Sequence, residues 1–309
     1  MEPEYISDII FSLKENFNID KNAEITLETN PGTVDKSKLN NFQKAGINRL
    51  SVGIQSFDEQ ELRFLTRIHD KETAIKTVNY AAEVGFENIN IDLIFNLPGQ
   101  SKDKWLSNLK AAVKLPIKHI SAYSLILERG TILNKLVLDG KVIMQDDDYD
   151  ADLYETTINF LTSNGFYQYE VSNFSKQGYE CLHNNAYWRY RDYIGFGTSA
   201  HSFMDGKRWW NFSSLKKYIY EIETNNHAIM NSENLSLQQM HDEYVMLAFR
   251  SSGLDLIDYK KKFGNDWIES KINYLESLKN ENLLRSFDSK ITLTPKGYAI
   301  CDEILKNIL

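Results

Sequence analysis

NINIDLIFNLPGQ, residues 88–100, contains the clearest strand of the chain and the turn that ends it. Isoleucine-rich residues 88–95 favour a strand, and Leu97-Pro98-Gly99 closes it. Three more strands are expected in this half of the chain, at residues 23–28, 49–54 and 119–125. Helices are expected at residues 3–18, 35–45, 58–84 and 101–113, the third either continuous or in two pieces that meet near His69-Asp70. Strands that alternate with helices indicate βαβ units and a parallel sheet.

Polar residues gather at the carboxyl ends of these strands or in the loops that follow, namely Glu28, Asn30, Gln55, Ser56, Asp92, Asn96, Tyr123 and Ser124. In β/α barrels that rim carries the ligand site, whereas a doubly wound sheet binds ligands mainly at one switch point. No Gly-x-Gly-x-x-Gly follows a strand, and no phosphate-binding P-loop is present. Four strands cannot close a barrel, so we expect a partial β/α barrel with an open edge at its first strand.

The pattern changes after residue 145. An acidic helix is expected at residues 146–161, strands at 167–171 and 207–211, a helix at 214–223 and a polar linker at 225–234. Helices at 237–250, 256–263 and 268–280 precede two short strands around Asp288 and a closing helix. We therefore predict three domains: the partial barrel over residues 1–145, an α+β region over 146–230 and a winged-helix-like domain over 231–309. Nearly balanced charges in the last domain favour a packing or protein-contact role over DNA binding.

Composition narrows the function. The net charge of −8 over 309 residues argues against nucleic acid or an anionic membrane surface as the main partner. No run approaches the roughly 18 apolar residues of a transmembrane helix, and the N-terminus lacks the basic region of a signal peptide, so we expect a cytoplasmic protein. Cys181 and Cys301 are the only cysteines. They are expected to be reduced thiols and cannot hold a cubane iron–sulfur cluster, which normally takes three or four thiolates.

The stretch CLHNNAYWRYRDYIGFGTSAHSF, residues 181–203, combines imidazole, indole, phenol and guanidinium groups. Such a set suits a flat, aromatic ligand that carries carboxylates. Imidazole can coordinate iron, aromatic rings can stack on a macrocycle, and arginine can bind a propionate. The glycines of Gly195-Phe196-Gly197 would let the backbone approach a ligand closely.

Four motifs occur in order: ITLETNPGTVD (25–35), RLSVGIQSFDEQEL (49–62), NIDLIFNLPGQ (90–100) and HNNAYW (183–188). Together they resemble the oxygen-independent coproporphyrinogen III oxidase-like branch of the radical S-adenosylmethionine (SAM) proteins. The likeness covers essentially the whole chain and is strongest to the HemW-type heme chaperones. It implies a radical-SAM-type α/β barrel, heme as the cofactor and acceptor heme proteins as partners, and it leaves a homodimer open. His183, Asn184, Tyr187 and Trp188 form the pattern that the family links with heme binding.

The resemblance also implies that Glu28, Gln55, Arg67 and Asp92 bind SAM. Carboxylates and an amide suit its ribose hydroxyls and amino group, and a guanidinium suits its carboxylate. Family members begin with a strand that carries a Cys-x-x-x-Cys-x-x-Cys loop, and this motif is absent here. We therefore expect an N-terminally truncated barrel that lacks its first strands, does not bind the family's 4Fe-4S cluster and is not catalytic as it stands.

Structural roles compete with each ligand assignment. His183 could coordinate heme iron, or it could be a histidine satisfied by backbone hydrogen bonds. Tyr187 could be a core aromatic, and Trp188 is more readily read as one. His201 could be a second ligand or a structural residue, and Cys181 could be a thiolate ligand or a buried thiol.

Three functions stay open. The first is a heme-binding chaperone that delivers heme to acceptor proteins, with Arg189 and Arg191 pairing either with propionates or with nearby acids. The second is an oxygen-independent coproporphyrinogen III oxidase that decarboxylates propionates in porphyrin biosynthesis by radical chemistry. The third is a mis-annotated fragment of either protein.

Overall fold

The computed structural model describes residues 1–309 and divides them into two compact units, Met1–Glu180 and Cys181–Leu309. This division differs from the predicted boundaries at residues 145 and 230. Residues 146–180 belong to the first unit because β6 (Asn173–Ser175) pairs with β4 (His119–Ser124) and α7 (Asp147–Ser163) packs against α5 (Lys102–Ala112).

The first unit is built on a six-stranded sheet with the order β1-β2-β3-β4-β6-β5. Its remaining strands are β1 (Thr26–Thr29), β2 (Arg49–Gln55), β3 (Asn88–Phe95) and β5 (Tyr167–Gln168). Strands β1 to β4 run parallel, whereas β6 is antiparallel to β4 and β5. The other helices are α1 (Pro3–Asn16), α2 (Lys36–Ala45), α3 (Glu59–Phe64), α4 (Lys71–Glu83) and α6 (Ile132–Leu138). The predicted alternation of helices and parallel strands is confirmed, and β1 is an edge strand.

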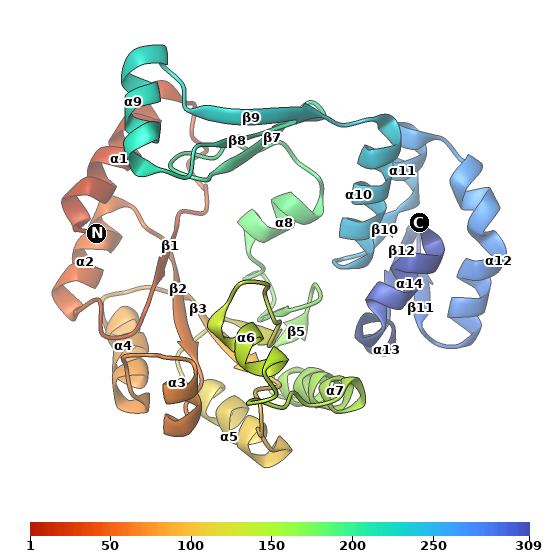
Figure 1. The fold of residues 1–309 in the computed structure, drawn as a ribbon, viewed down its shortest axis with the longest axis horizontal. Helices are drawn as coiled ribbons and strands as arrows, with labels where there is room; N and C mark the ends of the chain where they lie inside the picture. Colours follow the sequence, from red (N-terminus) through yellow and green to blue (C-terminus); the bar gives the residue numbers. More distant parts are fainter. The chain divides into compact units, whose positions relative to one another are not determined.

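The two faces of this sheet differ in polarity because successive side chains of a strand point to opposite faces. One face carries the apolar core, packed beneath the helices that lie along that side in Figure 1. Its fully buried members include Leu50, Val52, Ile54, Ile89, Ile91, Leu93 and Ile120. Each such side chain contributes roughly 1.5–3 kcal/mol by leaving water. The opposite face carries polar groups, and the candidate SAM residues Asp92 and Gln55 lie on it or at its rim.

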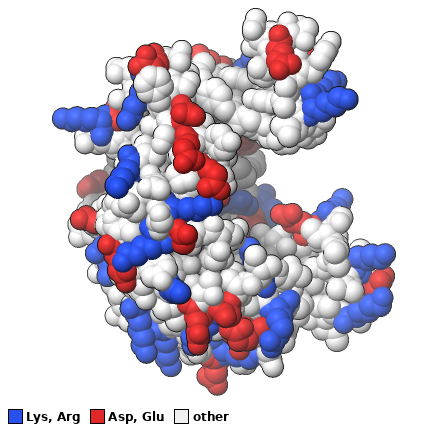
Figure 2. Space-filling model, turned by 90° about the vertical axis from the view of Figure 1, so that its left-hand side faces the viewer, with Lys and Arg blue, Asp and Glu red and all other residues white.

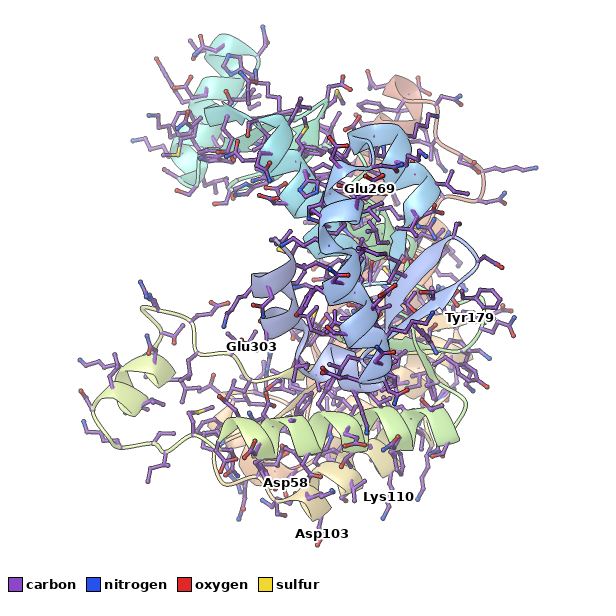
Figure 3. All side chains as sticks on the ribbon, turned by 90° about the vertical axis from the view of Figure 1, so that its right-hand side faces the viewer. Asp58, Asp103, Lys110, Tyr179, Glu269 and Glu303 are labelled. Carbon is purple, nitrogen blue, oxygen red and sulfur yellow. The ribbon has the colours of Figure 1, made fainter.

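Helices of the first unit begin where a side chain can accept a backbone N–H. Asp35, Asp58, Asp70 and Ser101 each accept such a bond at the start of α2, α3, α4 and α5. These caps satisfy donors that would otherwise lack partners in the first helical turn. Figure 3 shows α7 running alongside α5, with the labelled Asp103 of α5 at the periphery.

The second unit contains two three-stranded sheets. The first joins β7 (His201–Met204), β8 (Lys207–Asn211) and β9 (Ile229–Asn234), and the second has the order β10 (Leu254–Asp255), β12 (Lys290–Leu293), β11 (Leu284–Phe287). Its helices are α8 (Leu182–Trp188), α9 (Leu215–Asn225), α10 (Leu237–Phe249), α11 (Leu256–Phe263), α12 (Asp266–Asn280), α13 (Pro295–Ala299) and α14 (Cys301–Ile308).

The predicted polar linker at residues 225–234 is wrong over its second half. Residues 229–234 form β9, which pairs antiparallel with β8 although all six residues are exposed. Backbone hydrogen bonds to β8 make this segment a strand, although its polar sequence lacks the apolar alternation typical of one. The short helix α8 was not predicted either, and it carries the HNNAYW motif.

Charges of both signs are interspersed over the face drawn in Figure 2, as the net charge of −8 on a chain with 35 basic and 43 acidic residues would suggest. None of the helices combines the length and the apolar character needed to span a bilayer.

Candidate functional sites

Helix α8 presents the HNNAYW motif and is fixed at both ends by unusual groups. At its start the Sγ of Cys181 accepts the backbone N–H of Asn184 at 3.5 Å. At its end the N–H of Tyr190 bonds to the carbonyl of Tyr187 at 2.9 Å, and the N–H of Arg191 to that of Ala186 at 3.0 Å. This pair of bonds is the Schellman arrangement, which normally places glycine in the left-handed position.

Tyrosine occupies that left-handed position here, since Tyr190 has φ +55°. The conformation costs a residue with a Cβ roughly 1–2 kcal/mol. Side-chain contacts offset the cost: the ring of Tyr190 lies 4.7 Å from that of Phe203, and its hydroxyl donates to Glu243 at 2.9 Å. Burial raises the pKa of Tyr190, and the bond to Glu243 raises it further, so the phenol is a donor at neutral pH.

A cavity of about 340 Å³ lies within the second unit beside the end of α8. Aromatic rings, two guanidinium groups, one carboxylate and two apolar side chains of α10 line it. The lining residues are Tyr187, Tyr190, Arg191, Tyr193, Phe203, Arg208, Glu243, Met246 and Leu247. Its volume lies at the lower end of the roughly 300–1,000 Å³ typical of small-molecule sites, and its mainly apolar lining with few polar groups is typical of them too.

Of the predicted heme residues, Tyr187 lines this cavity and His183 contacts Tyr187. His183 is exposed, and its ring meets that of Tyr187 edge-on at 4.8 Å between centroids. Tyr187 in turn contacts Tyr193 at 4.6 Å. Asn184 lies in the first turn of α8, where its backbone N–H donates to the Sγ of Cys181. Trp188 is partly buried, and its Nε1 is a buried donor with no partner.

His201, the other histidine of the stretch, lies on β7 and stacks on Trp210 at 5.7 Å and 24°. It is not among the residues that line the cavity.

Gly195 has a different role from the one expected. A Cβ at this position would lie 2.2 Å from the carbonyl oxygen of His201, so the close approach is to the chain's own backbone and not to a ligand. The N–H of Gly195 also bonds to the Oγ of Ser202 at 3.0 Å. Gly197 has φ +99°, and its carbonyl accepts from Nδ2 of Asn211 at 3.0 Å. Both glycines therefore shape the loop that leads into β7.

In the first unit, two of the predicted SAM residues converge on Asn30. The Nη1 of Arg67 donates to Oδ1 of Asn30 at 3.1 Å, and Nε of Arg67 is buried without a partner. Gln55 lies at the end of β2 with φ +71°, a left-handed conformation that is uncommon outside glycine. A Cβ on Gly53 would lie 3.0 Å from Nε2 of Gln55 and 3.1 Å from Oδ1 of Asn30, so these two amides lie over the same glycine.

Asp92 lies deeper on the polar face of the sheet. It accepts from Oγ of Ser51 at 3.3 Å and from Nδ2 of Asn90 at 2.8 Å. Burial raises the pKa of Asp92, and the negative charge of Glu28 raises it further, which indicates that the two carboxylates face a common region. Glu28 itself is exposed on β1.

Hydrogen bonds continue from Asp92 to residues that sequence reasoning did not single out. Oδ1 of Asn90 bonds to Nδ1 of His119 at 2.6 Å, and Nε2 of His119 bonds to the hydroxyl of Tyr169 at 2.8 Å. His119 is completely buried, and burial holds its pKa well below the usual range, so its imidazole is neutral. Glu170 is also completely buried, and burial raises its pKa to about 7. Only the polar alternation of β3 and β4 hinted at this network.

The two cysteines do not form a cluster site. Cys181 caps α8, while Cys301 is buried in the apolar core of the second unit, where burial raises its pKa to about 11. No group of three or more His, Cys, Asp or Glu side chains is arranged to hold a metal ion. The thiols present therefore do not fit a 4Fe-4S cluster.

Comparison with known proteins identifies the fold and the family of this chain. Residues 1–112 match the sequence profile of the Radical SAM superfamily. The structure of coproporphyrinogen III oxidase (HemN) from Escherichia coli, a radical SAM enzyme, superposes on all of this chain and on 74% of its own length, with a TM-score of 0.80 and 23% identity. The chain thus has the α/β fold of the radical SAM superfamily.

Curated relatives narrow the family. The heme chaperone HemW of Bacillus subtilis (strain 168) is 31% identical over 283 residues, which are 91% of this chain and 75% of that protein. HemW of Lactococcus lactis subsp. lactis (strain IL1403) is 29% identical over 310 residues, covering 100% and 81%. The chain belongs to the HemW heme chaperone family.

Proposed function

We propose that this protein binds heme and passes it to acceptor heme proteins, in keeping with the name its relatives carry. The observation that supports this most is the position of His183, an exposed imidazole whose ring contacts Tyr187, one wall of the aromatic cavity. An imidazole sealed in the core could not reach an iron ion. An exposed one beside stacked phenol rings can coordinate iron while the rings cover the macrocycle.

Replacing His183 with alanine should weaken heme binding. We expect a rise in Kd of about tenfold or more, equivalent to roughly 1.4 kcal/mol, because the variant loses the imidazole that would coordinate the iron but keeps the cavity. The measurement is a titration of the purified chain with hemin, followed by the Soret band. His227→Ala removes another exposed histidine and should leave Kd unchanged. If His183→Ala binds hemin as tightly as the wild type, or if His201→Ala is the variant that loses binding, the assignment of His183 is wrong.

SAM is the second ligand that we propose, at the rim of the first unit. Arg67 would bind its carboxylate, and Gln55, Glu28 and Asp92 would bind its amino group and hydroxyls. The support is the buried, unpartnered Nε of Arg67 and the left-handed Gln55. In radical SAM chemistry SAM supplies a radical only together with the cluster, so the proposal for the residues described here is limited to SAM binding.

Anaerobic calorimetric titration with SAM tests this second proposal. We expect binding that Arg67→Ala weakens by about fivefold or more, since a charge-assisted bond to the ligand is lost. Arg63→Ala is the matched control, because Arg63 is an exposed arginine of α3. Wild-type protein that takes up no SAM, or an equal loss in both variants, would contradict the proposal.

We also propose two finer features of the fold, a winged-helix-like module and a partial barrel. The order α10, β10, α11, α12, β11, β12, with β12 central in its sheet, supports a winged-helix-like module over residues 231–309. The parallel β1 to β4 support part of a radical SAM barrel in the first unit. A coproporphyrinogen oxidase function has less support, because the likeness to that enzyme is one of fold at 23% identity.

A further inference from the structure

We propose that Arg191 binds a propionate carboxylate of heme at the cavity of the second unit, an inference that rests on the proposed heme-binding function. The proposal assigns this role to Arg191 and not to the neighbouring Arg189, although the sequence could not distinguish the two. It also excludes Arg208 from the role. It also assigns the cavity to the carboxylate-bearing edge of the porphyrin.

The charges of the cavity leave one cation available. The Nη2 of Arg208 bonds to both carboxylate oxygens of Glu243 at 2.7 Å, and its Nη1 bonds to Glu233 at 3.2 Å. Glu243 also accepts from the hydroxyl of Tyr190. Arg208 is thus neutralised by carboxylates of the protein, and Glu243 has its acceptors in use.

Arg191 differs in having no acidic partner. Its side chain lines the cavity and is exposed, and no ion pair involves it. Its backbone is nevertheless fixed, because its N–H closes the Schellman turn on Ala186. A guanidinium held at the wall of an aromatic cavity, with its donors unused, is a natural partner for a planar carboxylate.

The rest of the lining suits the ring of the same ligand. Met246 and Leu247 of α10 and Phe203 of β7 provide apolar surface, and Tyr193 and Tyr187 provide aromatic surface. His183 does not line the cavity but contacts Tyr187, so a flat ligand can reach iron-binding and carboxylate-binding groups on either side of one tyrosine. Arg189 is exposed and does not line the cavity.

The test compares three protein variants and two ligands. Hemin is titrated into the wild type, Arg191→Ala, Arg191→Lys and the matched control Arg189→Ala, and the titrations are repeated with hemin dimethyl ester, which keeps the iron but has no free carboxylate. We expect Arg191→Ala to raise the Kd of hemin by about two- to fivefold, the upper part of the range for an exposed charge pair. The ester should bind the wild type more weakly than hemin does, by a similar factor. It should bind the wild type and Arg191→Ala equally, because esterification and the substitution each remove the same contact. Arg191→Lys should retain part of the affinity, and Arg189→Ala all of it.

Outcomes that overturn the inference are distinct from those that overturn heme binding itself. Hemin binding that depends on His183 but is equal in the wild type and Arg191→Ala overturns the role of Arg191 only. So does an equal loss in Arg189→Ala, or a loss of ester binding in Arg191→Ala, which would indicate damage to the cavity. Failure of the wild type to bind hemin overturns both proposals. Circular dichroism and thermal unfolding of Arg191→Ala, Arg191→Lys and Arg189→Ala establish that the variants are folded.

Discussion

We expect Glu61→Ala to lower the free energy of unfolding of the first unit by about 3–5 kcal/mol, because it removes the acceptor of a buried network. The carboxylate of Glu61 accepts from Oγ of Ser56 at 2.5 Å, from Nδ2 of Asn108 at 2.8 Å and from Nε2 of Gln100 at 3.0 Å. All four side chains are buried. Each donor left without a partner costs roughly 1–3 kcal/mol.

The same network positions the rim of the sheet. Ser56 follows Gln55 directly, and Oε1 of Gln100 accepts the backbone N–H of Asn96, just after β3. Glu61 therefore ties the loops after β2 and β3 to α5. Its loss should loosen Gln55 as well as destabilise the core.

Hydrogen exchange of the amides of α3 and α5 measures this effect within the first unit. Glu61→Gln keeps the volume and one acceptor, so its loss should be intermediate. Glu72→Ala removes an exposed carboxylate from α4 and should change the opening free energy by less than about 0.5 kcal/mol. Opening free energies that fall by under about 1 kcal/mol in Glu61→Ala would show that the network contributes little.

The second large effect is a pH dependence caused by Glu170. Oε2 of Glu170 accepts the N–H of Ser172 at 3.2 Å, while Oε1 is buried without a partner. Burial raises its pKa from the ordinary value of 4.5 to about 7. Between these pH values the unfolded chain has released the proton and the folded chain has kept it, so stability falls as pH rises through the window. The full loss is about 3 kcal/mol, from 1.36 kcal/mol per pKa unit.

Glu170→Gln removes this titration while keeping the shape of the side chain. We therefore expect the free energy of unfolding of the variant, relative to that of the wild type, to rise by about 3 kcal/mol between pH 4.5 and 7.5. Urea unfolding at each pH measures this difference. Glu87→Gln, at an exposed glutamate, should show no such trend. A difference between Glu170→Gln and the wild type that is the same at every pH would rule out the raised pKa.

The unfolding free energy of the wild type must be subtracted from that of Glu170→Gln at each pH, because His119 changes stability with pH in the opposite direction. Burial lowers its pKa well below 6.5, and the charge of Arg49 lowers it further. Below pH 6.5 the unfolded chain gains a proton that the folded chain does not, so this residue costs stability as pH falls. His119 is present in both proteins and cancels when one curve is subtracted from the other.

Sequence reasoning predicted the elements that follow from local apolar pattern. Strands β2, β3 and β4 and the long helices were predicted because their buried residues recur at strand or helix spacing. Elements fixed by pairing were missed. β9 is exposed along its length and is a strand only because β8 pairs with it, and β6 is a three-residue segment added to the edge at β4.

The residues of the candidate sites also fall into those that the sequence indicated and those that only the structure shows. The sequence singled out His183 and both arginines of the stretch, but only the structure shows that Arg191 lines the cavity and Arg189 does not. Glu243, Met246 and Leu247 could not be predicted as lining residues, because α10 reaches the cavity from far along the chain. Glu61 and His119 looked like ordinary helix and strand residues until their partners were known.

The two ends of α8 have one more consequence. Among the helices with a side-chain N-cap, α8 alone is capped by sulfur, a weaker acceptor than the oxygens used elsewhere, and its last turn closes on a left-handed tyrosine instead of glycine. The contacts of Tyr190 with Phe203 and Glu243 hold the last turn in place, so the sulfur-capped first turn is the part of this seven-residue helix that we expect to open most readily. A carrier has to surrender its cargo as well as capture it, and under the proposed role of His183 such an opening at the start of α8 would ease that handover.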